Sequence, residues 1–194
     1  MHKSWAYSAF RNFVLKTQAT EHWKNHWQRI VPGDSVLDIG CGTGESLETM
    51  PEISYLGLDY NAGYVERARG RYGSRGEFRV FDISHDVLAE SNRFDLVLCY
   101  GVLHHLTDGQ VAKLMETAHR AMKPTGRLLT LDGVYHEGQP LLSRWMVSRD
   151  RGRFVREEKE YLRLAGLHFT NVRHELMQNM LRIPFSHIVM ECRR

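Results

Sequence analysis

Short apolar runs separated by longer amphipathic stretches make up most of this chain. Each run spans roughly four to seven residues, which is the length of a buried β-strand and too short for a typical helix. The runs are bounded by glycine, proline or acidic residues, as strands usually are. The expected strands are 36–39, 55–59, 78–82, 94–100, 127–132, 170–176 and 186–192.

The stretches between these runs have helical periodicity. Asn61 is placed to cap one helix and Thr107 to cap another, and apolar residues follow each at three- and four-residue steps. Aromatic and aliphatic residues recur in the same way up to about Val31, which predicts an N-terminal helical segment. Strands that alternate with helices predict an α/β protein with a parallel, doubly wound sheet and right-handed crossovers.

The run VLDIGCGTG at 36–44 ends a strand on an acid and breaks into a glycine loop. Alternate glycines let the backbone turn sharply and approach a ligand closely. A helix expected from Glu45 would present its free N–H groups to that ligand. The dinucleotide fingerprint has glycine or alanine where Glu45 stands, and it needs no acid at Asp38. An acid beside the loop suits a ligand with a cationic amino group and no phosphates, so S-adenosylmethionine is favoured over NAD.

Acids also end the next two predicted strands. Asp59 stands at the spacing at which a strand-end acid binds ribose hydroxyls in a Rossmann-type sheet. Asp82 is placed to meet an adenine amino group. Each acid also has a local alternative: Asp38 could bond nearby backbone N–H groups, and Asp82 could serve the turn that it flanks with Asp86.

Together with the block FDLVLCYGVLHHL at 94–106, these features resemble the class I S-adenosylmethionine-dependent methyltransferases, from about 35 to 131. The likeness is to the small-molecule branch, which often carries a Leu-His-His-like run after the fourth strand. It implies a Rossmann-like sheet of seven strands, mostly parallel with an antiparallel last strand, and Pro184 leaves room for that hairpin. It implies S-adenosyl-L-methionine as the cofactor and no metal. The expected cofactor-binding residues are Asp38, Gly40, Cys41, Gly42, Gly44, Asp59, Tyr60, Asp82, Ile83, Cys99 and Tyr100.

Two adjacent histidines, His104 and His105, follow the fourth strand at the edge where ligands bind in open α/β sheets. A neutral imidazole can take a proton from a hydroxyl, a phenol or an acidic carbon. Adjacent residues point in different directions, so at most one should face the acceptor. Both are candidate catalytic bases. The alternative is a structural histidine at the edge of the pocket, with methyl transfer by positioning alone.

The segment 133–166 mixes large aromatic side chains with arginines. Aromatic faces and guanidinium groups suit a planar acceptor that carries a carboxylate or a phosphate. Arg153, next to Phe154, is the preferred acceptor contact, and the N-terminal Trp5 and Tyr7 are expected to complete a lid over the carboxyl edge of the sheet. The alternative is an amphipathic surface helix whose arginines are solvated or paired with neighbouring glutamates.

Length and composition predict a single domain over 1–194, with a helical lid at 1–31, a cofactor-binding half at 35–132 and an acceptor-side half at 133–194. The net charge of +3 does not predict a nucleic-acid partner. Three scattered cysteines without a Cys-x-x-Cys pair indicate a reducing compartment and argue against structural zinc. With no signal-peptide core and no apolar run of bilayer length, a cytoplasmic location is expected.

The function expected is transfer of a methyl group to a small, anionic or aromatic organic acceptor by in-line displacement, performed by a monomer or homodimer. Enzymes that methylate the amino groups of adenine or glutamine carry an Asn/Asp-Pro-Pro-aromatic motif where this chain has 99–102, CYGV, which argues against those acceptors. The alternatives are an RNA or protein methyltransferase that uses the arginine-rich segment, and a non-catalytic S-adenosylmethionine-binding subunit of a partner enzyme. His22 and His26 have metal-site spacing, but no carboxylate follows in the metalloprotease position, so no metal is expected.

Overall fold

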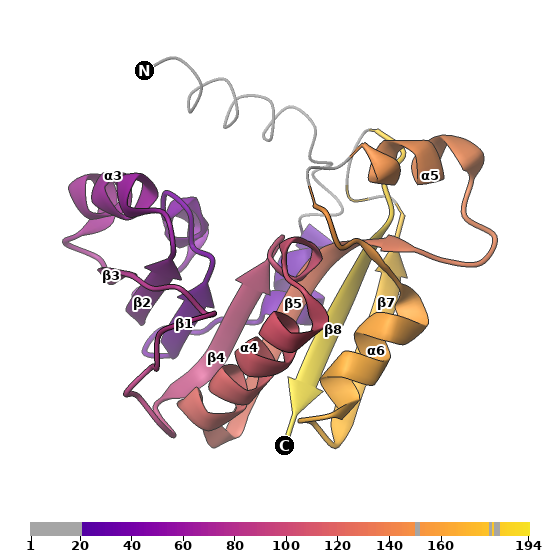
Figure 1. Cartoon of the computed structure of the whole chain (residues 1–194). Helices are drawn as coiled ribbons and strands as arrows, with labels where there is room; N and C mark the ends of the chain where they lie inside the picture. The colour runs from indigo at the N-terminus through magenta and orange to yellow at the C-terminus, as the bar shows by residue number, and fades with distance from the viewer. Residues whose placement is uncertain (1–20, 150–151, 179, 181–182) are drawn as a thin grey trace.

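The computed structural model describes residues 21–149, 152–178, 180 and 183–194 (Figure 1). Within these residues, eight strands form one sheet in the order β3-β2-β1-β4-β5-β8-β7, and the short β6 pairs with β5. Strand β8 is antiparallel to both β5 and β7, whereas the other neighbours are parallel. The mostly parallel sheet with an antiparallel last strand is confirmed. The strands are β1 Ser35–Ile39, β2 Ser54–Asp59, β3 Glu77–Val80, β4 Phe94–Tyr100, β5 Met122–Tyr135, β6 Arg156–Glu157, β7 Asn171–Met177 and β8 His187–Arg193.

The expected helix caps are confirmed. The side chain of Asn61 accepts a hydrogen bond from the backbone N–H of Tyr64 at 3.2 Å, and Thr107 forms a capping box with Gln110. No described helix is long and apolar enough to cross a membrane. The helical elements are η1 Trp23–Gln28, η2 Glu45–Thr49, α3 Ala62–Tyr72, η3 Leu103–His105, α4 Asp108–Ala121, α5 Leu141–Ser148 and α6 Glu158–Gly166.

Prolines account for two of the element boundaries that differ from the sequence expectation. The helix expected from Glu45 is only a five-residue 3-10 turn, because Pro51 disfavours helical backbone at the residue before it. Strand β5 begins at Met122 rather than at 127, because Lys123 precedes Pro124 and is pushed toward extended backbone.

Two apolar clusters pack on opposite faces of the sheet, as the alternation of side chains along each strand requires. One cluster joins alternate strand residues to α4 and α6, which lie in front of the sheet in Figure 1. The other cluster joins the remaining strand residues to α3 and to the two tryptophans of η1. The sheet is therefore covered on both faces, and its carboxyl edge lies at the top of Figure 1.

A polar anchor holds η1 against β5 and β8. The Arg127 side chain donates to the backbone carbonyl of Trp27 at 2.8 Å and to that of Gln28, so it satisfies carbonyls at the end of the helix. Arg29, just beyond, forms an ion pair with the buried carboxylate of Glu191 on β8. The N-terminal end of the described chain is thus attached to strands distant in sequence.

Candidate functional site

The glycine loop after β1 has the backbone that its sequence predicts. Gly40, Gly42 and Gly44 have φ angles of 82°, 56° and 78°, in the left-handed region that favours glycine. A Cβ on Gly40 would lie 2.3 Å from Cγ2 of Val102, so the loop backbone packs directly against the segment after β4. The loop therefore forms a backbone cradle at the carboxyl edge of the sheet.

Asp38 lies beneath this loop and is almost completely buried, with 1% of its surface exposed. Its Oδ2 accepts a hydrogen bond from the hydroxyl of Tyr55 on β2 at 2.7 Å. Burial raises the pKa of Asp38 to about 6, and the Tyr55 bond opposes that rise. The hydroxyls of Tyr55 and Ser46 both bond this carboxylate. A cationic group at this position would favour the charged carboxylate.

Asp59, at the end of β2, joins the glycine loop to the start of α3. Its Oδ2 accepts from the backbone N–H of Gly42 at 2.9 Å, and its Oδ1 accepts from that of Asn61 at 2.8 Å. Each carboxylate oxygen has two acceptor positions, so the group retains capacity for hydroxyl donors. The neighbouring Tyr60 is 75% exposed. Asp59 thus has the location expected of a ribose contact.

Asp82, beyond β3, serves its own turn. Its Oδ1 accepts from the backbone N–H of Ser84 at 2.8 Å, and its own N–H donates to Asp86 at 2.7 Å. The Ser84 N–H bond lowers the pKa of Asp82. The turn role that the sequence offered as an alternative is present, and adenine recognition by Asp82 stays a prediction. The following Ile83 is buried.

The cysteines near the site are packing residues. Cys41 and Cys99 are both buried, and burial raises the pKa of each thiol. A thiol held in its protonated form is a poor nucleophile. Tyr100, at the end of β4, makes an edge contact with Trp23 of η1, with ring centroids 5.3 Å apart. The two cysteines therefore serve packing, and Tyr100 joins β4 to η1.

A histidine–aspartate pair lies at the carboxyl edge of the sheet, next to the ends of β4 and β5. Nδ1 of His104 lies 2.7 Å from Oδ1 of Asp132 on β5, and the backbone N–H of His104 donates to the same oxygen at 3.2 Å. Both side chains are buried. Burial raises the pKa of Asp132, whereas its bonds with His104 lower it. The side chain of His105 is exposed, and of the two adjacent histidines it is His104 that bonds the carboxylate of Asp132.

Asp132 is missing from the sequence candidates. It ends the fifth predicted strand, as Asp59 ends the second, so the acid at the strand end was the signal for it. Strands β4 and β5 are parallel neighbours, which brings the segment after Tyr100 close to the carboxyl end of β5. The sequence alone does not show that β4 and β5 are neighbours, so it could not predict that Asp132 bonds His104.

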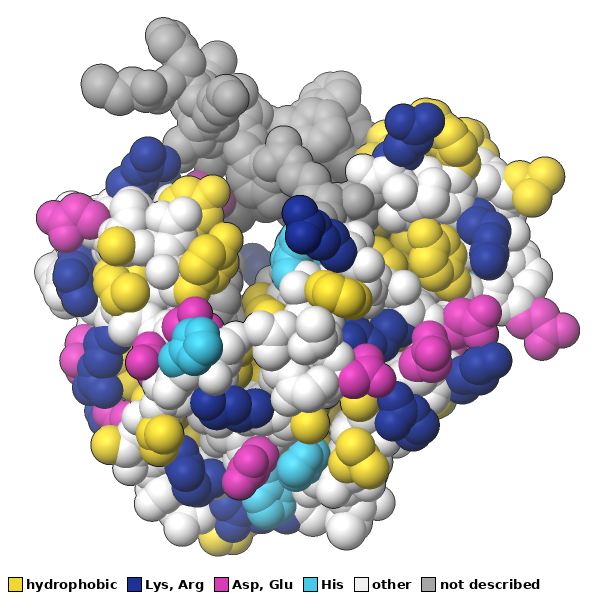
Figure 2. All heavy atoms as spheres, in the orientation of Figure 1, with side chains coloured by type: hydrophobic (Ala, Val, Ile, Leu, Met, Phe, Trp, Pro, Cys, Tyr) yellow, Lys and Arg dark blue, Asp and Glu magenta, His cyan; other side chains and the backbone are white. Residues whose placement is uncertain are grey.

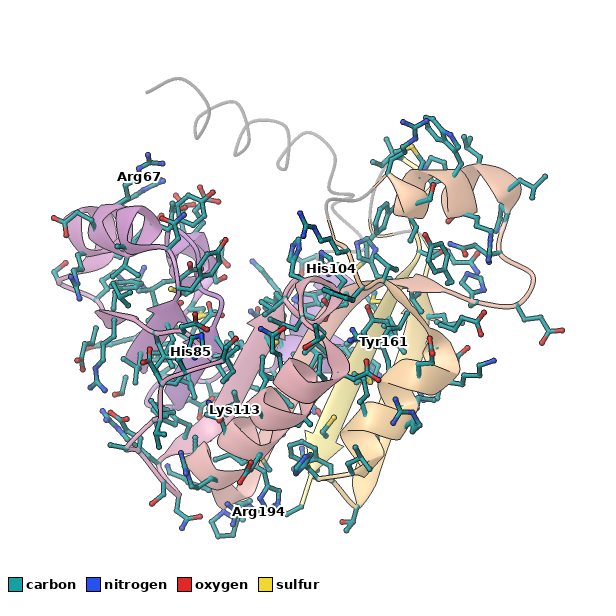
Figure 3. The ribbon with its side chains drawn as sticks, in the orientation of Figure 1. Arg67, His85, His104, Lys113, Tyr161 and Arg194 are labelled. Atoms are coloured by element: carbon teal, nitrogen blue, oxygen red, sulfur yellow. The ribbon has the colours of Figure 1, made fainter. Side chains whose placement is uncertain are left out.

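Two glycines lie near the ring of His104. A Cβ on Gly152 would lie 2.1 Å from Cδ2 of His104, and one on Gly101 would lie 3.8 Å from Cε1. The backbone of Gly152 therefore packs against the ring at Cδ2. The backbone N–H of Phe154 donates to the carbonyl of His104 at 2.9 Å. Residues 152–154 therefore pack directly on the histidine, whose location at the sheet edge is labelled in Figure 3.

Arg156 fastens this segment to the loop that carries His104. It is buried and donates to the carbonyls of Leu103 at 2.9 Å and Leu106 at 2.6 Å, and it pairs with Asp108 at 2.8 Å. Arg163 pairs with the other oxygen of Asp108. These two arginines of the basic segment are structural, and their partner is Asp108 rather than the neighbouring glutamates.

Three other described arginines of this region are exposed. Arg144 stacks over Tyr135 with 4.9 Å to the ring centroid, and Arg149 stacks over Trp145 with 5.3 Å. Figure 2 shows basic and apolar side chains gathered over α5 at the upper right. Arg153 is exposed. The lid residues Trp5 and Tyr7 lie outside the described residues.

The sheet edge thus carries two kinds of chemistry. On one side a glycine cradle is flanked by buried Asp38 and Asp59, which suits a ligand with an ammonium group and a ribose. On the other side a carboxylate holds Nδ1 of His104, and in a neutral imidazole held in this way Nε2 is the basic nitrogen. The two sides meet where Gly40 contacts Val102. Among the described residues, no group of three histidine, cysteine or acidic side chains has the arrangement of a metal site.

Comparison with known proteins agrees with this arrangement. Residues 36–126 match a family model described as a methyltransferase domain. The chain is 35% identical over 118 residues to a bovine protein described as probable tRNA methyltransferase 9B, covering 59% of this chain and 25% of the relative. It is 32% identical over 146 residues to wheat phosphoethanolamine N-methyltransferase 1, covering 70% of this chain and 28% of the relative. The chain spans about a quarter of the length of these curated relatives.

Solved structures share the fold at lower sequence identity. Geranyl diphosphate C-methyltransferase from Streptomyces coelicolor, in complex with Mg²⁺, geranyl diphosphate and S-adenosyl-L-homocysteine, superposes with a TM-score of 0.66 and 17% identity, covering 91% of this chain and 79% of that one. An S-adenosylmethionine-dependent methyltransferase from Methanosarcina mazei superposes with a TM-score of 0.63 and 17% identity, covering 86% and 95%. Residues 36–126 therefore match a methyltransferase domain, and the chain shares the fold of solved S-adenosylmethionine-dependent methyltransferases.

Proposed function

We propose that this chain transfers a methyl group from S-adenosylmethionine to a small organic acceptor, with His104 as the general base. The observation that carries the proposal is the buried contact of 2.7 Å between His104 and Asp132, beside a glycine cradle. Residues 35–132 bind the cofactor in this scheme, and residues 133–194 form the acceptor side. The division into two halves within one domain is part of the proposal.

The residues on the cofactor side fit the proposed ligand. Asp38 is a buried carboxyl group whose side-chain partners among the described residues are the neutral hydroxyls of Tyr55 and Ser46, and an ammonium group would stabilise its charged form. A Cβ on Gly42 would meet no atom within 4 Å, so the loop leaves open space at that position, and Asp59 offers further acceptor positions for ribose hydroxyls. Gly40, Cys41, Gly42 and Gly44 would approach the ligand through their backbone.

The chemistry divides between the ligand and the chain. When bound, S-adenosylmethionine supplies a methyl group on a positively charged sulfur, which is an activated leaving group. The chain must hold the acceptor in line with that methyl group, and correct placement can supply roughly 7–11 kcal/mol of the barrier. Asp132 holds the Nδ1–H tautomer of His104, so Nε2 can take the proton that the acceptor atom loses. The buried location of the pair limits competition from water.

Calorimetry with S-adenosylmethionine, S-adenosylhomocysteine and NAD tests the cofactor assignment. Both adenosyl ligands should bind, and NAD should not. Asp59→Asn should weaken binding at least about tenfold, because charge-assisted hydrogen bonds to the ribose contribute about 1.5–3 kcal/mol each. Asp34→Asn is a matched control, because that carboxylate bonds only an exposed backbone N–H group. Unchanged affinity in Asp59→Asn would remove Asp59 from the site.

Product analysis tests the reaction. The chain alone, with radiolabelled S-adenosylmethionine and a panel of phenols, hydroxy acids and amino alcohols, should release a labelled small molecule and S-adenosylhomocysteine. A chain that binds the cofactor tightly but labels nothing would instead be a non-catalytic subunit. That outcome would contradict the proposed base.

A tRNA acceptor is the second candidate, because relatives at 32–35% identity are described as probable tRNA methyltransferases. Binding of the phosphate backbone depends on counterion release, so activity on tRNA should fall steeply as salt rises. Transfer to a small acceptor should change little over the same range. Labelled tRNA, with a salt-sensitive rate, would replace the small-molecule proposal.

A further inference from the structure

We propose that Arg153 binds an anionic group of the acceptor, a carboxylate or a phosphate, beside the base His104. This inference rests on the proposed function and specifies the class of its acceptor. Arg153 is exposed, and the backbone segment that carries it packs on His104.

The position of residue 153 follows from its two neighbours. Gly152 contacts the imidazole of His104 so closely that a Cβ would lie 2.1 Å from Cδ2. Phe154 donates its backbone N–H to the carbonyl of His104 at 2.9 Å. Residue 153 lies between these contacts, so its Cα is held near the histidine. A long side chain from that point can reach an acceptor whose reacting atom lies against Nε2.

The backbone on the far side of Arg153 is held in place. Arg156 bonds the carbonyls of Leu103, Leu106 and Phe154, and it pairs with Asp108. These contacts tie the segment to the same loop that carries His104. The distance between residue 153 and the base is therefore set by buried hydrogen bonds, as a specificity contact requires.

Arg153 differs from the other arginines of this region in its partners. Arg156 and Arg163 share Asp108, while Arg144 and Arg149 stack on aromatic rings. Within the part of the chain that the structure describes, no carboxylate lies within ion-pair distance of Arg153. A guanidinium without a carboxylate partner among the described residues is suited to a bidentate contact with a ligand carboxylate or phosphate.

The neighbouring side chain adds an apolar surface to this contact. Phe154 is 38% exposed, a large value for a phenylalanine held by its backbone against a buried histidine. A planar acceptor could place its ring against Phe154 and its anionic group on Arg153. The acceptor class is therefore a small molecule with an anion and a methylatable atom on one rigid, planar frame.

The test compares anionic and neutral probes on the chain saturated with S-adenosylhomocysteine. The probes are 4-hydroxybenzoate, phenyl phosphate and phenol, and their dissociation constants are measured by NMR titration of the histidine ring signals. At least one anion should bind about tenfold more tightly than phenol, which is the gain expected from one charge-assisted contact. The probe that gains more distinguishes a carboxylate site from a phosphate site.

Variants locate the effect. Arg153→Gln should remove the preference for the anion, and Arg153→Lys should retain only part of it, because an ammonium lacks the planar fork. Arg149→Gln is the matched control from the same segment and should keep the full preference. All three should bind S-adenosylhomocysteine like the parent.

Three outcomes would overturn the inference. Equal binding of all probes, an anion preference that survives in Arg153→Gln, or one that is lost in Arg149→Gln would each exclude Arg153 as the specific contact. A parent chain that fails to bind S-adenosylhomocysteine would overturn the proposed function itself. The two failures are thus distinguishable in one set of measurements.

Discussion

The cofactor side and the acceptor side of this sheet edge are built differently. On the cofactor side, Asp59 bonds the backbone of the loop and of α3 within about twenty residues of sequence, and Asp38 bonds the adjacent strand. On the acceptor side, His104 depends on Asp132, 28 residues away, and its loop is held by Arg156, about 50 residues away.

The difference indicates which parts of such a site can vary. Backbone contacts made by glycines tolerate few substitutions, because a side chain would collide or strain the turn. The acceptor side relies on separate polar side chains, with exposed apolar residues such as Leu141 and Trp145 on the nearby α5. One half can remain constant for a shared cofactor while the other changes with the acceptor.

The largest effect should come from breaking the acceptor side alone. Asp132→Asn should lower the turnover number roughly a hundredfold or more, because an amide N–H facing Nδ1 favours the wrong histidine tautomer. The affinity for S-adenosylhomocysteine should be unchanged. Steady-state kinetics with an identified acceptor, over pH 5 to 9, provides the measurement.

Two features of that pH series separate a catalytic from a structural role. The parent rate should rise with pH through the range in which histidine loses its proton. In Asp132→Asn this rise should be displaced, while the melting temperature stays close to that of the parent. Nearly full turnover in the variant would leave methyl transfer to positioning alone.

Breaking the junction of the two sides should have the next largest effect. Gly40→Ala combines a φ of 82° with a contact of 2.3 Å to Val102, so we expect a loss of about 1–3 kcal/mol in the free energy of unfolding, together with weaker cofactor binding. Chemical denaturation and calorimetry would measure both. Gly70→Ala is the control, because a Cβ there meets nothing within 4 Å in a helix.

The double variant Gly40→Ala, Val102→Ala separates the two causes. Removing the valine methyl groups relieves the collision but leaves the strained turn, so only part of the stability should return. If Gly40→Ala were as stable as Gly70→Ala, the close contact between the two sides would be absent.

Lowering the pH should weaken cofactor binding through Asp38 on the cofactor side. The pKa of Asp38 is about 6, so its carboxylate is charged above that pH and protonated below it. Affinity for S-adenosylhomocysteine should fall as pH decreases from 7 to 5, approaching about tenfold per pH unit below 6, because only the carboxylate can pair with an ammonium group. Calorimetry across this range measures the slope.

Two variants identify the group responsible for that slope. Asp38→Asn should bind weakly and with little pH dependence. Asp95→Asn should keep the parent slope: burial raises the pKa of Asp95, but Lys123 and Ser35 lower it to about 2, so this group stays charged throughout. A parent affinity that is constant from pH 7 to 5 would contradict the pairing of Asp38 with the ligand.

The smallest effect should come from His105. Its side chain is exposed, and Asp132 is bonded to His104 instead. His105→Ala should change the turnover number by no more than about twofold, as substitutions at exposed positions usually do. A loss as large as that of Asp132→Asn would assign the base to His105.

The cofactor side was predictable because its signals are local. The order of strand, acid, glycine loop and second acid lies within 36–59, and it predicts both the turn geometry and the place of Asp59. The caps at Asn61 and Thr107 were predictable for the same reason. In each case the partners are close in sequence, so composition and spacing carry the information.

The acceptor side could be predicted only in outline. His104 was a candidate, but its partner Asp132 depends on the pairing of β4 with β5. The role of Arg156 depends on an irregular segment that no periodicity describes. The sequence shows only that both positions are arginine, so it cannot distinguish the buried Arg156, which bonds backbone carbonyls, from the exposed Arg153. Partners distant in sequence account for what was missed.

The docking of η1 has a consequence for the order of events during synthesis. Trp27 bonds Arg127 and Glu175, which follow it by 100 and 148 residues, and Arg29 pairs with Glu191, 162 residues later. Contacts of such separation close late. On the ribosome, Trp23 and Trp27 are among the first described residues to emerge, yet they are buried only when β8 has been made. A nascent chain therefore exposes both tryptophans until β8 has been made, and exposed apolar surface of this kind favours aggregation.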